Sequence, residues 1–253
     1  MIESTSDRLS PTVRPVGPPV MYQSWSQLLF LHWEVPIAPL AALLPPDLEI
    51  DTYEGKAYIG LIPFTMQGVR PRGLPAVHWL SNFHETNVRT YVRIGNSEPG
   101  VWFFSLEAAN PIAVAIARKW FHLPYFHARM SLTSDDSGLI TYSSTRLVAG
   151  PNPPSCQIQA RPTGEIAPAQ YGTLEHFLVE RYILYSARRG GLARGRVHHS
   201  AYPLQPVEVF KVEENLIASS TIVRPDLCPL AHFASKVVVE IFPLENLDNL
   251  ARK

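Results

Sequence analysis

Polar and apolar side chains alternate most clearly along residues 83–93, FHETNVRTYVR. Side chains on a strand point alternately to its two faces, so this pattern predicts a strand with one polar face. The polar face carries Glu85, Asn87, Arg89 and Tyr91. The next apolar run, residues 101–106 (VWFFSL), is apolar on both faces and predicts a strand that is covered on both sides. These two strands are therefore the first place to look for a site.

Other short runs of β-branched and aromatic residues, bounded by proline, glycine or polar residues, predict further strands. They occupy residues 25–35, 48–52, 56–66, 129–132, 139–148, 155–162, 193–199, 204–212 and 237–242, with a weaker pattern at 218–224. The run at 56–66, KAYIGLIPFTM, is apolar on both faces over most of its length and indicates a central strand. The residues that follow, 67–80, are rich in arginine, proline and glycine and predict an exposed loop.

Three segments carry the helical spacing of apolar residues. A short helix is predicted at 36–44, where two prolines end it. A second is predicted at about 111–120, with Asn110 as its cap and a proline in its first turn. The longest is predicted at 174–189, between a threonine cap and a Gly-Gly pair. Its apolar stripe consists of Leu174, Phe177, Leu178, Tyr182 and Tyr185.

Many strands, two or three helices and no internal repeat predict one α+β domain. Its sheet should be mostly antiparallel and closed or strongly curled into a barrel. Residues 21–253 would form this domain, preceded by a polar, proline-rich arm at 1–20. With 253 residues, 46% of them hydrophobic, the chain is long enough to bury a sizeable core.

The charge balance narrows the classes of partner. Lys+Arg and Asp+Glu are both 22, so no basic excess indicates nucleic acid. No run reaches the ~18 apolar residues of a membrane span, and no signal-peptide pattern is apparent. We therefore expect a cytoplasmic protein without nucleic-acid or membrane partners, and leave a homo-oligomer open. Cys156 and Cys228 have no metal-ligand spacing and are expected to be free thiols.

The polar face of residues 83–93 has two interpretations. Charged residues are mostly exposed, so the face could be solvated and make ordinary cross-strand charge pairs. If the neighbouring strand is covered on both sides, the polar face is covered as well. A buried carboxylate, amide, guanidinium and phenol on one face could then bind a small polar ligand, because buried charge is costly unless it is paired.

Three residues outside that strand complete the candidate site. Arg118 lies near the end of an otherwise apolar helix, and is either a surface arginine or a binding group for an organic acid. Tyr125, whose approach is fixed by Pro124, is either a core tyrosine or a hydrogen-bond donor to a carbonyl. Arg181, in the stripe of the longest predicted helix, could neutralise Glu85 or a ligand acid, or belong to a structural ion pair.

Metal binding is the main rival chemistry, because the chain has nine histidines. None of them forms an HExxH motif or an i, i+4 pair. His198 and His199 are adjacent, and on a strand they would point to opposite faces, so at most one of them faces a given site. We therefore expect no metal and no cofactor, and the sequence leaves open which of the two histidines faces a site.

The chain resembles the uncharacterised YqjF-like family over nearly its whole length. The segments that carry the resemblance are LLFLHWEV, LLPPDLEIDTYEGKAYIGLIPFTM, ETNVRTYV, GVWFFSLEA, ARKWFHLPYFHARM and FLVERYILYSARRGGLARGRVHHSAYPLQPVEV. YqjF-like proteins are distantly similar to acetoacetate decarboxylase. That similarity implies a cone-shaped antiparallel barrel with packed helices and an internal pocket.

The similarity to the decarboxylase can be followed at three points. Its active-site glutamate, in a Tyr-x-Glu strand, corresponds to Glu85, and its Gly-Arg-Glu helix end to Ala117-Arg118-Lys119. Where the decarboxylase has Pro-Lys-Lys, this chain has Pro124-Tyr125-Phe126. The first lysine forms a Schiff base with the keto acid and the second lowers its pKa, which tyrosine and phenylalanine cannot do. The resemblance therefore implies a related pocket without acetoacetate decarboxylase activity.

Three functions are left open by the sequence. The chain could bind a small organic acid or carbonyl compound, held by Arg118 and Glu85 with help from Arg89 and Arg181. It could be a lyase, hydratase or isomerase in which Glu85 is the acid or base and Tyr125 the carbonyl donor. It could also be a scaffold without a ligand. A closed pocket around Glu85, Arg118 and Tyr125, with a raised Glu85 pKa, would favour the enzyme.

Overall fold

A computed structural model describes residues 8–95, 97–188 and 191–247 of the chain. Within these ranges, the strands form one 13-stranded hydrogen-bonded sheet. They are β1 (Met21–Val35), β2 (Glu49–Ile50), β3 (Ala57–Pro71), β4 (Phe83–Ile94), β5 (Ser97–Ala108), β6 (Tyr125–Ser134), β7 (Ile140–Arg146), β8 (Ser155–Pro162), β9 (Ile183–Arg188), β10 (Gly191–His198), β11 (Leu204–Glu214), β12 (Leu230–Ile241) and β13 (Glu245–Asn246). The α-helices are α2 (Ile37–Ala41), α3 (His78–Ser81), α4 (Pro111–Trp120) and α5 (Leu174–Val179), and the 3-10 helices are η1 (Ser10–Thr12) and η2 (Ala218–Ser220).

The sheet divides at both edges of a central wall made of β12, β1, β3, β4 and β5. The start of β5 pairs with β9, whereas its end pairs with β6; both pairings are parallel. The end of β12 pairs with β10 through two residue pairs, and its start pairs with β11. The wall therefore belongs to two rings of strands. β9 and β10 complete the first ring, and β6, β7, β8 and β11 complete the second.

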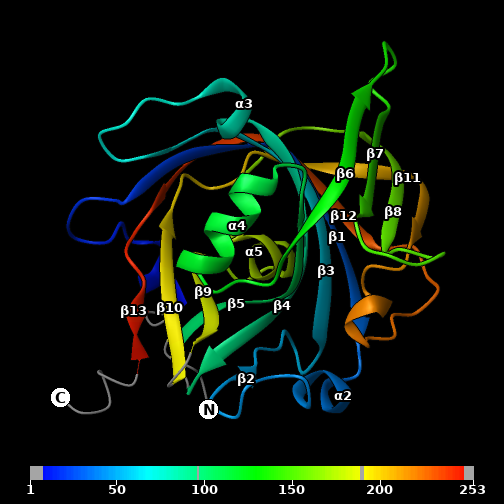
Figure 1. Ribbon diagram of the computed structural model, residues 1–253. Coiled ribbons are helices and arrows are strands. Elements are labelled where there is room, and N and C mark those ends of the chain that lie inside the picture. The colour runs from blue at the N-terminus through cyan, green and yellow to red at the C-terminus, as the bar shows by residue number, and fades with distance from the viewer. Residues whose placement is uncertain (1–7, 96, 189–190, 248–253) are drawn as a thin grey trace.

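Each ring encloses its own hydrophobic core, which explains why β1 and β3 are apolar on both faces. Phe30 of β1 and Phe64 of β3 pack inside the first ring, together with Phe177 of α5. Leu31 and Leu61, from the opposite faces of the same strands, pack inside the second ring. Figure 1 shows α5 surrounded by the strands of the first ring, with α4 across the end nearest the viewer.

The predicted fold class is confirmed: the sheet is mostly antiparallel, and it closes into rings around packed helices. Each strand predicted from the hydrophobic pattern overlaps an observed strand, except the weak one at 218–224, which contains η2 instead. Helix α4 begins where predicted, because the Asn110 side chain accepts from the amides of Ile112 and Ala113 at 3.0 Å.

The helix predicted at 174–189 is wrong beyond Val179. Helix α5 ends there, and residues 183–188 form β9 between β5 and β10. The stripe of apolar residues fits either structure over so short a run. Closure of the first ring favours the strand over the helix, because β9 fills the gap between β5 and β10 and buries Ile183 and Tyr185. Residues 189–190, part of the predicted helix end, lie outside the described ranges.

The exposed loop predicted at 67–80 is also partly wrong. Strand β3 continues to Pro71, opposite Met21 of β1, and α3 occupies residues 78–81. Pairing with the unusually long β1 keeps this polar end of β3 extended. The intervening residues, 72–77, are exposed as predicted.

Candidate functional site

The polar face of β4 is buried, so the interpretation of a solvated outer face is wrong. Glu85 is 2% exposed, Asn87 5%, Arg89 8% and Tyr91 0%. In the register with β3, Glu85 lies beside Phe64 and Asn87 beside Ile62, two residues of the first-ring core. This face of β4 therefore turns into the first ring, where each charge needs a partner or a shifted pKa.

Glu85 and Tyr125 are brought together by α4. The helix returns the chain to the sheet, so that Tyr125, the first residue of β6, lies beside Leu106 of β5. Its hydroxyl donates a hydrogen bond to Oε2 of Glu85 at 3.0 Å. Burial raises the pKa of Glu85 to about 8, against the lowering effect of that hydrogen bond, and raises the pKa of Tyr125 well above its usual value. At neutral pH the pair is therefore mostly uncharged.

A buried ion pair on the other side of the wall adds to the Glu85 shift. Glu107 of β5 accepts from Arg146 of β7 and, at 3.2 Å, from Ser105. The negative charge of Glu107 further raises the pKa of Glu85. The sequence analysis did not identify this pair, because nothing local relates residues 107 and 146.

Arg89 is a buried cation without a carboxylate partner in the described part of the chain. Its Nη2 donates to the carbonyl of Leu178 at 3.2 Å. Its guanidinium carbon lies 5.8 Å from the ring centres of both Phe30 and Tyr91. No described carboxylate lies within 4.0 Å, and Nε has no hydrogen-bond partner there. An arginine in this setting is suited to bind an anion.

Other polar atoms of the first ring also lack hydrogen-bond partners among the described residues. They are Oδ1 of Asn87, Nε2 of His199 and Nε1 of Trp25. The His199 ring lies 5.8 Å from that of Trp25 and stacks on Tyr182 at 4.5 Å. Burial lowers the pKa of His199 to about 4, with Arg89 also contributing, so its imidazole is neutral at pH 7. Nδ1 of His199 donates to the carbonyl of Ser200, so Nε2 of the neutral ring is an acceptor, as is Oδ1 of Asn87, whereas Nε1 of Trp25 is a donor. These atoms fit a ligand with neutral polar groups that both donate and accept hydrogen bonds.

The two adjacent histidines point to opposite sides of the strand end. His199 is 4% exposed and faces the first ring, whereas His198 is half-buried and lies 3.7 Å from the carboxylate of Glu240. The sequence could not choose between them. Trp25 was also missed, because one tryptophan in an apolar strand has no distinctive local signal.

Arg118 and Tyr91 are less available than the sequence suggested. Arg118 is exposed on α4, and its Nε donates to the Tyr125 carbonyl at 2.6 Å, so it holds the backbone beside Glu85. The Tyr91 hydroxyl donates to the Leu178 carbonyl and lies 2.6 Å from Nε2 of His32. Both residues support their neighbours through these contacts.

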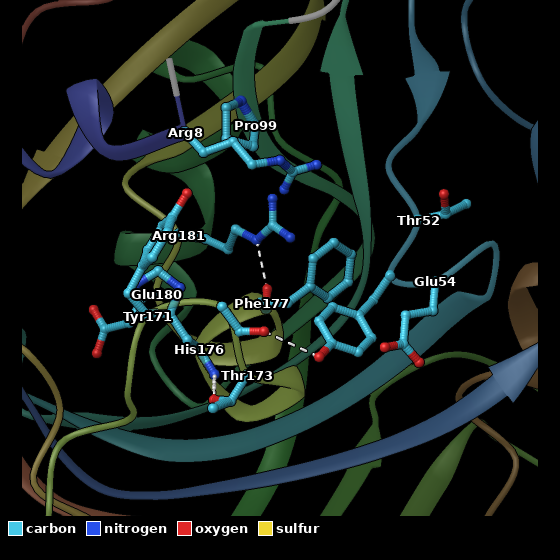
Figure 2. Close-up of a pocket in the computed structure, with 12 residues that line it drawn as sticks. Arg8, Thr52, Glu54, Pro99, Tyr171, Thr173, His176, Phe177, Glu180 and Arg181 are labelled. Carbon is cyan, nitrogen blue, oxygen red and sulfur yellow. Dashed lines mark hydrogen bonds between the residues drawn. The ribbon is translucent and has the colours of Figure 1, made fainter. Parts of the chain in front are cut away.

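Arg181 lies just after α5 and not within a long helix. Its guanidinium packs on Tyr91, which is six residues along β4 from Glu85. Its Nη1 bonds Asp51 at 2.6 Å and its Nε donates to the carbonyl of Phe177 at 2.7 Å. The carboxylate it neutralises is therefore Asp51, which the sequence analysis did not consider. Arg181 is also the one predicted site residue that lines the pocket of ≈220 Å³ shown in Figure 2.

The described ranges show no group of three or more His, Cys, Asp or Glu residues that could hold a metal ion. Both cysteines are free, Cys156 buried and Cys228 exposed. Among the helices in those ranges, none is long and apolar enough to cross a membrane.

Comparison with known proteins gives the family. The family model for DUF2071, described as an uncharacterized conserved protein, matches residues 22–238. This chain belongs to the DUF2071 family. It is 38% identical over 232 residues to the uncharacterized protein YqjF of Bacillus subtilis (strain 168), covering 91% of this chain and 93% of YqjF.

Solved structures relate the DUF2071 chain to a wider fold. The enduracididine biosynthesis enzyme MppR complexed with pyruvate has a TM-score of 0.61 at 10% identity, over 91% of each chain. Acetoacetate decarboxylase from Legionella pneumophila has 0.60 at 14% identity, over 96% of this chain and 94% of that one. An acetoacetate decarboxylase-like enzyme from Sphingomonas wittichii RW1 has 0.61 at 14%, over 90% and 92%. These similarities establish an acetoacetate decarboxylase-like fold.

Proposed function

We propose that this protein binds a small organic acid or carbonyl compound inside the first ring of strands, without Schiff-base decarboxylase chemistry. The observation that carries the proposal is Arg89, a buried guanidinium that no described carboxylate neutralises. Leaving a buried charge unpaired costs several kcal/mol, roughly, and an organic anion would remove that cost. The pyruvate bound by MppR is a ligand of this chemical class.

The surroundings of Arg89 support a ligand with both an acidic and a neutral polar end. Asn87, His199 and Trp25 offer one acceptor and two ring nitrogens without partners in the described chain. A keto acid has a carboxylate for Arg89 and a carbonyl for a donor such as Nε1 of Trp25. Glu85, protonated at neutral pH, is a further hydrogen-bond donor on the same face of β4, four residues along the strand from Arg89.

Schiff-base chemistry lacks a suitable amine. Tyr125 occupies the position of the lysine that forms the imine in acetoacetate decarboxylase, as the sequence resemblance implies. Among the described lysines, Lys56, Lys119 and Lys236 are exposed, and Lys211 is half-buried and paired with Glu213. Lysines that form imines with carbonyl compounds are desolvated in an apolar pocket or set beside another cation, whereas these four are exposed or bonded to a carboxylate.

Calorimetric titration tests the binding proposal with pyruvate, acetoacetate and other small keto acids. We expect wild type to bind at least one of them, and Arg89→Met to weaken that binding by about tenfold or more. Arg93→Met on the same strand is the matched control, because Arg93 pairs with Glu49 near the surface. If wild type binds none of these acids, the proposal is wrong and a scaffold function gains support. If Arg89→Met binds an acid as tightly as wild type and Arg93→Met do, the acid is not held by Arg89 and the proposed site is wrong.

Borohydride treatment tests the chemical part of the proposal separately. With pyruvate or acetoacetate present, we expect no stable mass increase on the protein. A reduced adduct on any lysine would overturn the exclusion of Schiff-base chemistry, whatever the binding experiment shows.

The Glu85–Tyr125 pair favours one second candidate, an enzyme that moves a proton beside a carbonyl. A carboxyl with a pKa of about 8 can give or take a proton near neutral pH, and a tyrosine hydroxyl can polarise a carbonyl. In D2O, such an enzyme would exchange the protons next to the carbonyl of a bound keto acid. Glu85→Gln should then bind the acid but lose exchange. A bound acid that shows neither exchange nor conversion leaves binding as the function.

A further inference from the structure

One edge of strand β6 lacks a neighbouring strand over most of its length. Strand β5 pairs only with residues 125–127 of β6, whereas β7 pairs with the opposite edge from Ala128 to Ser134. Within the described ranges, residues 128–134 therefore have a strand partner on one side only. Such an edge offers amides and carbonyls to which the strand of another chain can bond.

The hydrogen bonds to the β7 side show which residues face the free edge. The amide of Leu147 donates to the carbonyl of His127 at 2.8 Å, and the amide of Asp135 donates to that of Leu139 at 3.1 Å. Every second residue of an antiparallel strand bonds to its partner, so the odd-numbered residues face β7. The even-numbered residues present their amides and carbonyls to the free edge, and they are Ala128, Met130, Leu132 and Ser134.

This part of β6 is accessible. Figure 1 shows the hairpin of β6 and β7 projecting beyond the rest of the molecule. Arg129, Ser131 and Thr133 are exposed, and Met130 is only half-buried. Leu132 is also half-buried, although it packs against the core of the second ring. A second chain that covered this edge would therefore bury further apolar surface.

The long free edge of β11 differs from that of β6. Strand β11 pairs with β12 only through residues 204–206, so residues 207–214 also have one strand partner, β8. Its register with β8 shifts between Val209 and Lys211, and Pro206 lies where the pairing with β12 ends. Its charged residues are Glu208, Lys211, Glu213 and Glu214.

Bulges, prolines and charges are the devices that keep edge strands from pairing with other chains. The segment 128–134 of β6 has no proline, its register with β7 has no shift, and Arg129 is its one charged residue. Of these two long edges, β6 is therefore the one suited to pair with another strand.

The sequence of this edge is complementary to itself in the antiparallel direction. If two copies pair about Ser131, Met130 lies opposite Leu132 of the partner subunit, and Arg129 lies opposite Thr133 of the partner subunit. Apolar residues then meet on one face, and no like charges are opposed on the other. The even-numbered residues also lie opposite one another, so the free amides and carbonyls can bond.

We propose that the free edge of β6 is a dimerisation surface, which pairs with the same edge of a second copy of this chain about a two-fold axis at Ser131. Main-chain hydrogen bonds would provide the affinity, and the side-chain pairs would fix the register. The surface does not include Glu85 or Arg89, so the dimer is independent of the proposed keto-acid site.

Sedimentation at increasing protein concentration tests the dimer. Wild type should pass from monomer to dimer. Ser131→Lys should weaken dimerisation by about tenfold or more, because it places two like charges opposite each other at the two-fold axis. Ser143→Lys is the matched control and should dimerise like wild type. The Ser143 hydroxyl lies 2.8 Å from that of Ser131, but on β7, away from the free edge.

A disulfide tests the register. Opposite residues that do not bond through their backbones lie about 4.5 Å apart at Cα, within the range of a disulfide. With the exposed thiol removed by Cys228→Ser, Ser131→Cys should therefore form a covalent dimer on oxidation, and Ser143→Cys should not. The proposal is overturned if wild type stays monomeric, if Ser131→Lys dimerises as well as Ser143→Lys, or if Ser131→Cys cross-links no better than Ser143→Cys.

Discussion

At the residue scale, Glu85 differs from an ordinary glutamate because its carboxyl has been moved out of water without gaining a cation. Its hydrogen bond from Tyr125 offsets part of the burial cost, and the negative Glu107 behind the wall adds to it. The proton is therefore retained up to about pH 8. The same isolation makes Glu85 useful as a neutral donor and makes its ionisation costly for the fold.

Replacing Glu85 with glutamine should flatten the pH dependence of stability. The folded-state pKa of about 8 lies above the ordinary 4.5, so the folded chain holds this proton more tightly than the unfolded chain. The stabilisation is complete below pH 4.5 and is lost as pH rises through 8, by up to about 1.4 kcal/mol per pH unit. Urea denaturation of wild type and Glu85→Gln at several pH values measures this change in the free energy of unfolding with pH.

The exposed Glu208→Gln is the control for that experiment, and should follow the wild-type curve. Parallel pH curves for wild type and Glu85→Gln would show that Glu85 is ionised in the fold and would contradict the assignment.

Removing one partner of the ion pair between Glu107 and Arg146 should lower the stability of the fold strongly. Arg146→Leu leaves the fully buried Glu107 without its cation and should cost about 3–5 kcal/mol. Replacing both residues with leucine should cost much less, because no charge then stays buried. The exposed pair of Lys56 and Glu34 is the comparison, and Lys56→Gln should cost much less stability than Arg146→Leu, because solvent screens an exposed ion pair. Equal losses for the single and double variants would refute this explanation.

At the scale of elements, β9 shows how packing overrides local pattern. Its apolar residues have a spacing that also fits a helix, but as a strand it connects β5 to β10. The contact depends on Gly100 of β5. A Cβ atom there would lie 2.8 Å from the carbonyl oxygen of Ile183 and from the ring of Tyr185. A glycine therefore allows β9 to approach β5 closely.

Alanine at Gly100 should destabilise the protein by about 1–3 kcal/mol, because the backbone of β9 must move. Gly195→Ala on β10 is the matched comparison. Its nearest neighbours, at 3.0–3.1 Å, are the ends of the leucine side chains 184 and 244, which can shift. Chemical denaturation should therefore rank Gly195→Ala as the milder change. The reverse order would mean that β9 does not pack against Gly100 in this way.

At the scale of the whole molecule, the central wall is the part shared by both rings. Strands β1 and β3 are covered on both faces, whereas β10 closes the first ring through two residue pairs with β12. Regions with more buried contacts open less often. The proposed keto-acid site lies inside this less securely closed ring.

Amide hydrogen exchange should reflect that difference. The amides of β1 and β3 should exchange most slowly, near the rate of global unfolding, and those of β9 and β10 faster. A bound keto acid should slow exchange in β9, β10 and α5 more than in the second ring. Uniform protection of both rings would show that they open together.

Much of the fold could be predicted from local pattern. A strand buried on one face has an apolar residue at every second position, and a strand buried on both faces is apolar throughout. The Asn110 cap, β8 and the polar face of β4 all follow from such local rules. The helix assigned to 174–189 failed because its stripe suited two structures. For the site, Glu85 followed from the alternating strand pattern and Tyr125 from its position after Pro124, and the family resemblance indicated the same two residues. His199, Trp25 and Asp51 carry no local signal.

The sequence by itself determined most of the strands, the mostly antiparallel class and the absence of a lysine at position 125, because these depend on residues close together in the chain. Only the tertiary structure decided that the sheet divides into two rings, that Arg181 pairs with Asp51, and that Arg89 lacks a carboxylate within the described residues. The reason is physical. A charge is neutralised by whatever the fold brings within about 4 Å, and that neighbour can lie more than a hundred residues away.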